Sequence, residues 1–244
     1  MTARDKLIVA LDVDSADRAL DLFAALREVV GMFKVGSQLF TASGPDIVRK
    51  IVAGGGRVFL DLKFHDIPNT VAAAGIEATR LGVSIFNVHA SGGAEMMKRA
   101  AEAVAETADR EHLAKPRVIA VTVLTSLDRK NLKQIGLNGD LRAVATRLAR
   151  MASECGMDGV VASAQEIEPI REAITEPNFL IVTPGIRPGN NPPDDQQRTL
   201  TAAEAIRAGA DYLVIGRPIL TADRPVDRAR QFVDEIGSAL TGSE

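Results

Sequence analysis

The chain has 244 residues, of which 46% are hydrophobic and 25% are charged. This balance is typical of a globular protein with a packed core and excludes a fibrous or intrinsically disordered chain. The 29 Lys and Arg residues nearly balance the 32 Asp and Glu residues, so the formal net charge of -3 provides no global field that would attract nucleic acid.

The N-terminal segment, MTARDKLIVALDVDS, contains an apolar run of only five residues before Asp12. Such a run is too short for a signal peptide or a membrane span, so we expect a cytoplasmic protein without a membrane partner. The single cysteine, Cys155, excludes an internal disulfide. Its position in the apolar stripe LARMASECGM predicts a buried helix residue rather than a nucleophile.

Eight short apolar runs rich in β-branched residues recur along the chain, and each one predicts a buried strand. They lie at residues 6–13, 32–37, 57–64, 84–90, 117–125, 158–164, 179–185 and 211–218. Strands that are apolar along nearly their whole length are buried on both faces, as in a parallel sheet.

Amphipathic stretches rich in Ala, Leu, Glu and Arg separate these runs and predict helices. Several begin at a capping residue and end before a glycine, as at Ser15 with Gly31, Asn69 with Gly82, and Asp140 with Gly156. Eight strand–helix units predict a (β/α)8 TIM barrel, with a doubly wound open sheet as the alternative. Because no linker divides the chain, we expect one domain over residues 1–244.

Two polar segments are too long for simple connections. They are residues 125–140 after the fifth predicted strand and residues 186–199 after the seventh. In a barrel the carboxyl ends of the strands form the active face, so both segments are candidate lids. The alternative is that they are exposed polar loops.

Charged residues gather at the ends of the first three predicted strands. Asp61 and Lys63 are two residues apart, which puts both side chains on one face of a strand, and Asp66 follows in the loop. Asp12 and Lys34 close the first and second strands in the same way. Buried charges need partners and are common at functional sites. The alternative is a structural ion-pair network that fills the barrel mouth.

The pattern Asp61-x-Lys63-x-x-Asp66 resembles the D-x-K-x-x-D signature of the orotidine 5'-phosphate (OMP) decarboxylase suprafamily, and the wider string FLDLKFHDIPNT resembles OMP decarboxylases specifically. Further matches run through nearly the whole chain: VALDV at 9–13, FKVG at 33–36, NVHASGG at 87–93, VTVLTS at 121–126, TPGIRP at 183–188 and VIGRPI at 214–219.

This resemblance implies the decarboxylation of OMP to UMP and CO2 without metal or cofactor, the last step of de novo UMP biosynthesis. It implies that Lys63 donates a proton to C6 of the pyrimidine and that Asp61 lies against the departing carboxylate. It also implies a homodimer, in which Asp66 and Thr70 reach the partner subunit's site. The remaining implied contacts are Asp12 and Lys34 with the ribose hydroxyls, Thr125 and Ser126 with the pyrimidine, and Pro184 with the same pocket.

Phosphate recognition has a separate physical argument. TIM barrels often bind phosphate with the loops after strands seven and eight, where Gly185, Gly216 and Arg217 fall. Gly216 allows a close approach of the backbone to an anion, and Arg217 offers a forked set of donors. The family resemblance adds Arg187 and Gln196 to this group.

Two other classes of function remain open. Metal-dependent phosphosugar aldolases or decarboxylases of the same suprafamily share the signature, but they have an acidic metal-binding residue where this chain has Lys34. A non-catalytic sensor of a phosphate ligand is a further alternative, because a fold alone never establishes catalysis. His65, His89 and His112 lack the spacing of metal ligands, and we expect at most a supporting role for His89.

Overall fold

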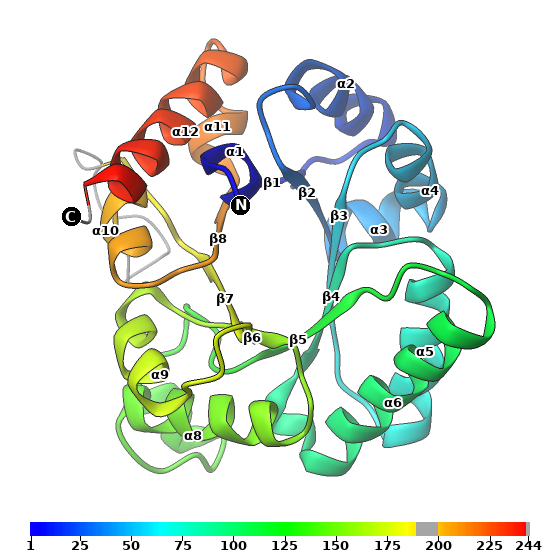
Figure 1. The fold of residues 1–244 in the computed structure, drawn as a ribbon, viewed down its shortest axis with the longest axis vertical. Coiled ribbons are helices and arrows are strands. Elements are labelled where there is room, and N and C mark those ends of the chain that lie inside the picture. Colours follow the sequence, from blue (N-terminus) through cyan, green and yellow to red (C-terminus); the bar gives the residue numbers. More distant parts are fainter. Residues whose placement is uncertain (189–199, 243–244) are drawn as a thin grey trace.

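The computed structural model describes residues 1–188 and 200–242. Its eight strands are all parallel and pair in the order of the sequence, and the last strand pairs with the first to close a barrel. Helices surround the barrel on the outside (Figure 1). The fold is therefore the predicted (β/α)8 TIM barrel, and the alternative prediction of a doubly wound open sheet was wrong.

The strands are short. Their bounds are β1 Leu7–Ala10, β2 Met32–Gly36, β3 Val58–Phe64, β4 Ile85–His89, β5 Arg117–Val121, β6 Gly159–Val161, β7 Leu180–Pro184 and β8 Tyr212–Ile215. Each predicted run contains one of these strands. Several runs extend further, because their last residues leave the sheet and line the mouth of the barrel.

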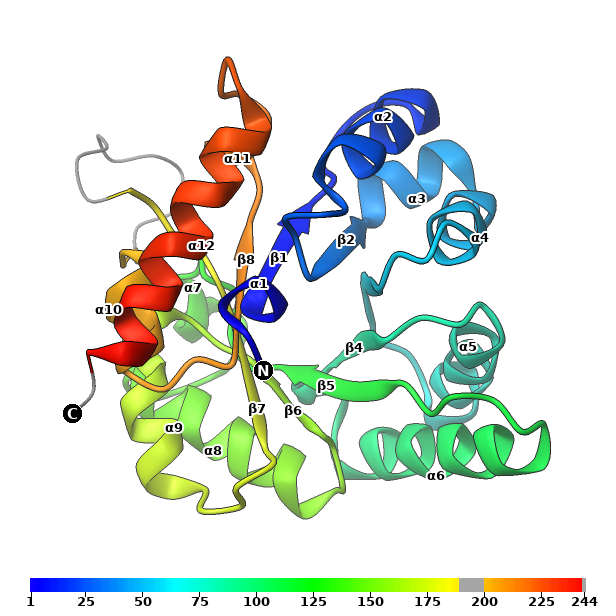
Figure 2. The same cartoon turned by 45° about the horizontal axis from the view of Figure 1, so that its top comes forward.

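The helices follow the strands around the ring. They are α1 Ala3–Lys6, α2 Ala16–Leu26, α3 Ser37–Ser43, α4 Asp46–Ala53, α5 Pro68–Arg80, α6 Ala94–Arg110, α7 Arg129–Gln134, α8 Leu141–Glu154, α9 Ile167–Ala173, α10 Ala202–Arg207, α11 Arg217–Leu220 and α12 Pro225–Thr241. Two short 3-10 helices, η1 Ala90–Gly92 and η2 Ala164–Glu166, follow β4 and β6. The N-terminal helix α1 packs against α12 (Figure 2).

The strands alternate between two hydrophobic cores. Ile8 of β1 and Phe59 of β3 belong to the core inside the barrel, together with residues of the other strands. Leu7 and Leu60, which are next to Ile8 and Phe59 in the sequence, belong to the larger core between the strands and the helices. Side chains of barrel strands are expected to alternate in this way between the inside and the outside. The position of a residue along its strand therefore decides whether its side chain points into the barrel.

Four of the six predicted helix caps are confirmed and two were wrong. Gly82 and Gly156 directly follow the C-caps of α5 and α8, and both have positive φ, of 74° and 76°. Ser15 and Asp140 accept hydrogen bonds from backbone N–H groups at the starts of α2 and α8. Asn69 lies inside α5, because Pro68 already has the fixed φ of a first helical residue. Helix α2 ends at Leu26, well before Gly31. Gly31 instead allows a close crossing of the chain, since a Cβ there would lie 2.5 Å from the carbonyl oxygen of Arg4.

Only the first of the two candidate lids is described in full. Residues 125–140 contain helix α7, for which Asp128 is the N-cap. Most of residues 186–199 lies outside the described residues.

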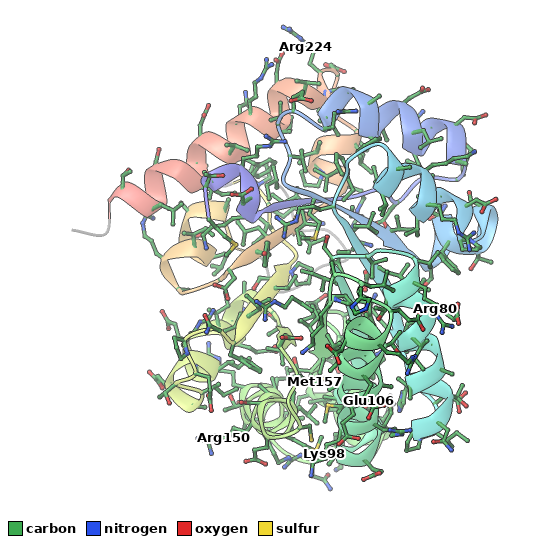
Figure 3. All side chains as sticks on the ribbon, turned by 45° about the vertical axis from the view of Figure 1, so that its right-hand side comes forward. Arg80, Lys98, Glu106, Arg150, Met157 and Arg224 are labelled. Carbon is green, nitrogen blue, oxygen red and sulfur yellow. The ribbon has the colours of Figure 1, made fainter. Side chains whose placement is uncertain are left out.

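The outer surface carries charged side chains that point away from the barrel, such as Arg80, Arg150 and Arg224 (Figure 3). Cys155 is buried, as predicted, but it is the C-cap that follows α8 rather than a residue within the helix. In the described part of the chain, no helix combines the length and the apolar character that crossing a membrane requires.

The close contact between β6 and β7 gives a test of this packing. A Cβ on Gly159 would lie 2.3 Å from the carbonyl oxygen of Leu180, which is also its partner in the strand register. We expect Gly159→Ala to lower the free energy of unfolding by about 1–3 kcal/mol, the usual cost of overpacking. Urea denaturation followed by circular dichroism measures the change.

Gly237 of α12 provides the matched control, because a Cβ there would meet only Ala3 Cβ at 3.7 Å. Gly237→Ala should raise the free energy of unfolding by about 0.5–1 kcal/mol, because alanine has the higher helix propensity. Equal effects of the two substitutions would contradict the tight contact at Gly159.

Candidate active site

Four charged side chains form an alternating row at the mouth of the barrel. The ammonium of Lys34 donates to Asp12 Oδ1 at 3.0 Å and lies 3.1 Å from Asp61 Oδ2. The ammonium of Lys63 donates to Asp61 Oδ1 at 2.7 Å. The row therefore runs Asp12, Lys34, Asp61, Lys63, so that each neighbouring pair has opposite charges.

The strand register explains why these charges meet inside the barrel. On β1, β2 and β3 the inward positions are apolar deep in the barrel and become charged toward the carboxyl ends of the strands. The successive inward residues are Ile8, Ala10 and Asp12; Met32 and Lys34; and Phe59 and Asp61. The apolar layer closes the barrel below, so the charged residues form the floor of its open end.

Lys34 and Asp61 are each only 8% exposed, so their charges depend on one another. Burial disfavours the charged form of Lys34, but Asp61 and Asp12 outweigh it and raise the pKa of the ammonium above its usual value. Burial also disfavours the carboxylate of Asp61. The charges of Lys34 and Lys63, with hydrogen bonds from Lys63 and Asn87, nevertheless hold the pKa of Asp61 below its usual value. Both residues are therefore ionised at neutral pH.

Asn87 of β4 is a member of this cluster that the sequence reasoning missed. It is completely buried, and its side-chain amide donates to Asp61 Oδ1 at 2.7 Å. Its amide oxygen accepts a hydrogen bond from the backbone N–H of Lys63 at 2.8 Å. A signal was present in the sequence, because Asn87 is the polar residue within the otherwise apolar run IFNV.

The backbone of Lys63 also differs from the ideal strand assumed from the spacing. Its φ is +53°, in the left-handed region that non-glycine residues rarely adopt. The register between β3 and β4 shifts between Leu60 and Phe64, so Lys63 lies in an irregular part of the strand. The prediction that Asp61 and Lys63 converge is confirmed, but a bulge rather than a regular strand brings them together.

A cavity of about 250 Å³ opens above the charged row. One side carries the charges, and the opposite side is largely apolar. Its lining comprises Ala10, Asp12, Lys34, Phe59, Asp61, Lys63, Val121, Val123, Leu124, Thr125, Val161, Ala162, Pro184, Gly185, Arg187, Val214, Gly216 and Arg217. A ligand that fits this cavity would present a charged or polar edge to one wall and a flat apolar face to the other.

Two arginines line the part of the cavity formed after β7 and β8. Arg187 follows β7, and Arg217 begins α11 after β8. Gly216 lies beside Arg217, and a Cβ there would come within 3.4 Å of Ala10 Cβ and 3.6 Å of Asp12 Oδ2. The absence of a side chain at Gly216 thus leaves space between the arginine and the charged row.

The structure brings together most of the residues singled out in the sequence, but not all. The cavity contains Asp12, Lys34, Asp61, Lys63, Thr125, Pro184, Arg187, Gly216 and Arg217. Ser126 is exposed in the turn after Thr125 and is not part of the cavity lining. Gln196 lies outside the described residues.

Asp66 and Thr70 lie away from the cavity of their own subunit. Asp66 is exposed, and its carboxylate accepts a hydrogen bond from the N–H of Ile67 at 2.6 Å. It borders a separate shallow hollow together with Ser91 and Gly92. Thr70 is exposed on α5. Neither residue is part of the lining of the cavity of its own chain.

His65 and His89 lie beside Lys63. Their ring centroids are 5.4 Å apart. Burial, together with the nearby charges of His65 and Lys63, lowers the pKa of His89 below its usual value. Among residues 1–188 and 200–242, no group of three His, Cys, Asp or Glu side chains is arranged to hold a metal ion.

A closed barrel with paired, buried charges in a cavity at the carboxyl ends of its strands defines the site of a TIM-barrel enzyme. Comparisons with known proteins identify the family. Residues 5–232 match the model of the Orotidine 5'-phosphate decarboxylase / HUMPS family. The chain therefore belongs to this family.

Curated relatives match almost end to end. The chain is 52% identical over 238 residues to the orotidine 5'-phosphate decarboxylase of Syntrophotalea carbinolica, covering 98% of this chain and 97% of the relative. It is 53% identical over 236 residues to that of Geobacter sulfurreducens, covering 96% and 97%. The crystal structure of orotidine 5'-phosphate decarboxylase from Lactobacillus acidophilus has a TM-score of 0.83 and 33% identity, covering 94% of this chain and 98% of that one.

Proposed function

We propose that this chain converts OMP to UMP and CO2 in pyrimidine biosynthesis, and that residues 1–244 act as one catalytic domain. The observation that carries the proposal is the alternating row of Asp12, Lys34, Asp61 and Lys63 on the floor of the cavity. Full-length identity of about half to curated decarboxylases supports the same reaction. A step in nucleotide biosynthesis also supports the cytoplasmic location expected from the sequence.

The shape of the cavity supports a nucleotide monophosphate as the ligand. The arginine side, with Arg187, Arg217 and the backbone at Gly216, suits the phosphate, because guanidinium groups bind phosphate oxygens in pairs. We assign Gln196 to the same end of the ligand. Asp12 and Lys34 then reach the ribose hydroxyls.

The pyrimidine ring lies deeper in this arrangement. Thr125 and Pro184 line the part of the cavity opposite the charged row, and we assign them to the ring together with Ser126. The apolar side chains of Val121 and Val161 flank the same space. A flat ring held there presents its carboxylate edge to Asp61 and Lys63.

The chemical step needs a cation next to C6. When the bond between C6 and the carboxylate carbon breaks, CO2 leaves and the electron pair stays on C6. The ring π-system cannot delocalise that in-plane pair. We propose that the ammonium of Lys63 stabilises the carbanion and then transfers a proton to C6, after which solvent returns a proton to Lys63. Asp61 holds the ammonium at 2.7 Å and lies against the departing carboxylate.

One ion pair is not enough to account for catalysis. Two unit charges 4 Å apart interact by about 4 kcal/mol at an effective dielectric constant of about 20, whereas enzymes lower barriers by about 8–23 kcal/mol. Binding energy from the phosphate and ribose must therefore contribute in the transition state. Closure of residues 125–140 over the ligand is the simplest way to use it.

The position of Lys34 argues against the alternative that this chain is a metal-dependent aldolase or decarboxylase. Its ammonium lies between the carboxylates of Asp12 and Asp61, within 3.1 Å of an oxygen of each. A divalent ion beside Asp61 would be repelled by this cation, whose charge the same carboxylates stabilise. A non-catalytic sensor would not require the buried ion pair of Lys34 and Asp61.

We further propose that the active form is a homodimer in which Asp66 and Thr70 complete the partner's site. Both residues are exposed and lie outside the cavity of their own chain. Ile67, next to Asp66, is a large apolar residue that is 66% exposed. An exposed apolar residue beside an exposed carboxylate supports an interface on this side of the barrel.

The first test is the reaction itself. The purified chain should convert OMP to UMP in buffer containing a chelator, because no step in the proposal uses a metal. Lys63→Ala should abolish detectable turnover while UMP still binds, since the phosphate and ribose contacts are separate from the proton donor. The decrease in absorbance of OMP and calorimetric binding of UMP measure the two effects. Activity that is lost with chelator and restored by a divalent ion would favour the metal-dependent alternative.

The second test concerns the phosphate. Arg217→Ala should lower kcat/KM for OMP roughly 10- to 150-fold, the effect of losing a charge-assisted contact of about 1.5–3 kcal/mol. The slower reaction of orotidine, which lacks the phosphate, should not change. Arg224→Ala is the matched control, because Arg224 points into solvent on the outer surface (Figure 3). Equal proportional losses for both substrates would mean that Arg217 supports the barrel rather than the phosphate.

The third test concerns the dimer. Lys63→Ala and Asp66→Ala are each expected to be inactive, but mixing them under conditions of subunit exchange should restore about a quarter of wild-type activity. Half of the randomly formed dimers are mixed, and one of the two sites in each mixed dimer has both native residues. Mass spectrometry of the dimers verifies exchange. No recovery despite verified exchange would place Asp66 in the site of its own subunit.

A further inference from the structure

The strand that carries Asp61 and Lys63 contains an unusual bulge. Strands β3 and β4 pair in regular register at Leu60 with Phe86, and the next aligned pair is Phe64 with Val88. Residues 61–63 of β3 therefore lie opposite Asn87 alone. Extra residues in one strand disrupt the ladder of backbone hydrogen bonds and re-aim side chains, and bulges of this kind are common next to active sites.

The side chain of Asn87 takes the place of the missing ladder contact. Its oxygen accepts the backbone N–H of Lys63 at 2.8 Å, where a regular strand would offer a backbone carbonyl. This N–H belongs to the residue with φ of +53°. A lysine in that conformation is disfavoured on its own and persists only where its surroundings hold it. The contact with Asn87 is one such restraint.

The other end of the same amide restrains the carboxylate. The nitrogen of Asn87 donates at 2.7 Å to Asp61 Oδ1, the oxygen that also accepts from the Lys63 ammonium at 2.7 Å. Asn87 thus contacts both the backbone of Lys63 and Asp61, whose carboxylate binds the Lys63 ammonium. Because an amide is planar, its donor and acceptor have a fixed separation. Asn87 is fully buried, so bulk water does not compete for these bonds.

We propose that Asn87 is a positioning residue that fixes the Lys63 ammonium and the Asp61 carboxylate relative to each other for proton transfer. The inference rests on the proposed decarboxylation. Asn87 need not touch the ligand, since it is not part of the cavity lining. Without its amide, the bulge can relax toward ordinary backbone angles and Asp61 Oδ1 loses a fixed donor. Both changes move the ammonium away from the place where charge develops, and small misplacements of a catalytic group have large effects on rate.

Two variants separate the contributions of the amide. Asn87→Leu has a similar size and removes both hydrogen bonds. Asn87→Asp keeps an acceptor for the Lys63 N–H but places a carboxylate oxygen against Asp61. We expect kcat for OMP to fall at least about tenfold in the leucine variant and further in the aspartate variant, while UMP affinity changes by less than about threefold. Phosphate and ribose binding should persist because Arg187 and Arg217 are untouched.

Thr79→Val is the matched control for loss of a buried polar group. Thr79 is buried on α5 and donates to Gly75 O at 2.9 Å, outside the charged row. This variant should lose stability but keep the wild-type kcat. Thermal melting of all variants identifies any that are unfolded at the assay temperature. If kcat of a folded Asn87 variant stays within about twofold of the wild type, the positioning role is wrong.

The pH profile adds a readout that a packing role would not change. Asp61 is faced by Lys34 from β2, Lys63 from its own strand and, further away, His89 from β4. Removing the Asn87 donor raises the pKa of Asp61, so the acid limb of kcat/KM should move to higher pH in the leucine variant. The added carboxylate should move it further. If the pH profile does not shift and the loss of rate only parallels the loss of stability, Asn87 is a packing residue and the positioning role is wrong.

A crystal structure of Asn87→Leu tests the geometry independently of turnover. We expect Lys63 to leave the left-handed region and its ammonium to separate from Asp61 Oδ1. An unchanged Lys63 would overturn the proposal even if the rate had fallen. If the wild type itself does not decarboxylate OMP, the proposed reaction is wrong, and the structure of the variant still decides whether Asn87 holds Lys63.

Discussion

The charged row at the mouth of this barrel depends on the carboxylate of Asp61. It is 8% exposed, accepts hydrogen bonds from the ammonium of Lys63 and the amide of Asn87, and forms an ion pair with the ammonium of Lys34. A buried carboxylate without such partners would be too costly to ionise. Lys34 depends on Asp61 in turn, because its own burial would otherwise favour loss of its proton. Removing any one of these groups therefore changes the charge balance of the others.

The barrel makes this arrangement possible because the inward residues of a strand form an apolar core at one depth and the charged row at another. The deeper inward residues, such as Met32 and Phe59, pack into an apolar core that closes the barrel. The next inward residues, such as Lys34 and Asp61, lie above that core at the open end. The apolar layer keeps water from reaching the charges from below, and the helices exclude it from the sides. Electrostatic interactions are stronger in such surroundings than in water.

Periodicity in the sequence predicted the eight strands, the closed barrel and the convergence of Asp61 with Lys63, because a period of two fixes which side chains point inward. It could not predict the bulge, since the register of β3 against β4 and the left-handed Lys63 depend on contacts between distant residues. Asn87 stands out as a polar residue in an apolar run, but its hydrogen bonds to Lys63 and Asp61 of the neighbouring strand could not be predicted from the sequence. The prediction at Gly31 was wrong because a glycine required by a close crossing looks like a helix end in sequence.

The bulge also explains how the chain can place a lysine and an aspartate from the same strand in direct contact. In a regular strand, side chains two residues apart stand side by side and roughly parallel. Here the left-handed backbone at Lys63 redirects its side chain, and the ammonium reaches Asp61 Oδ1 at 2.7 Å. Such a conformation is stable only when neighbouring strands restrain it. The strain is thus localised at the residue to which we assign the proton transfer, and the partner strand β4 supplies a restraint through one buried amide.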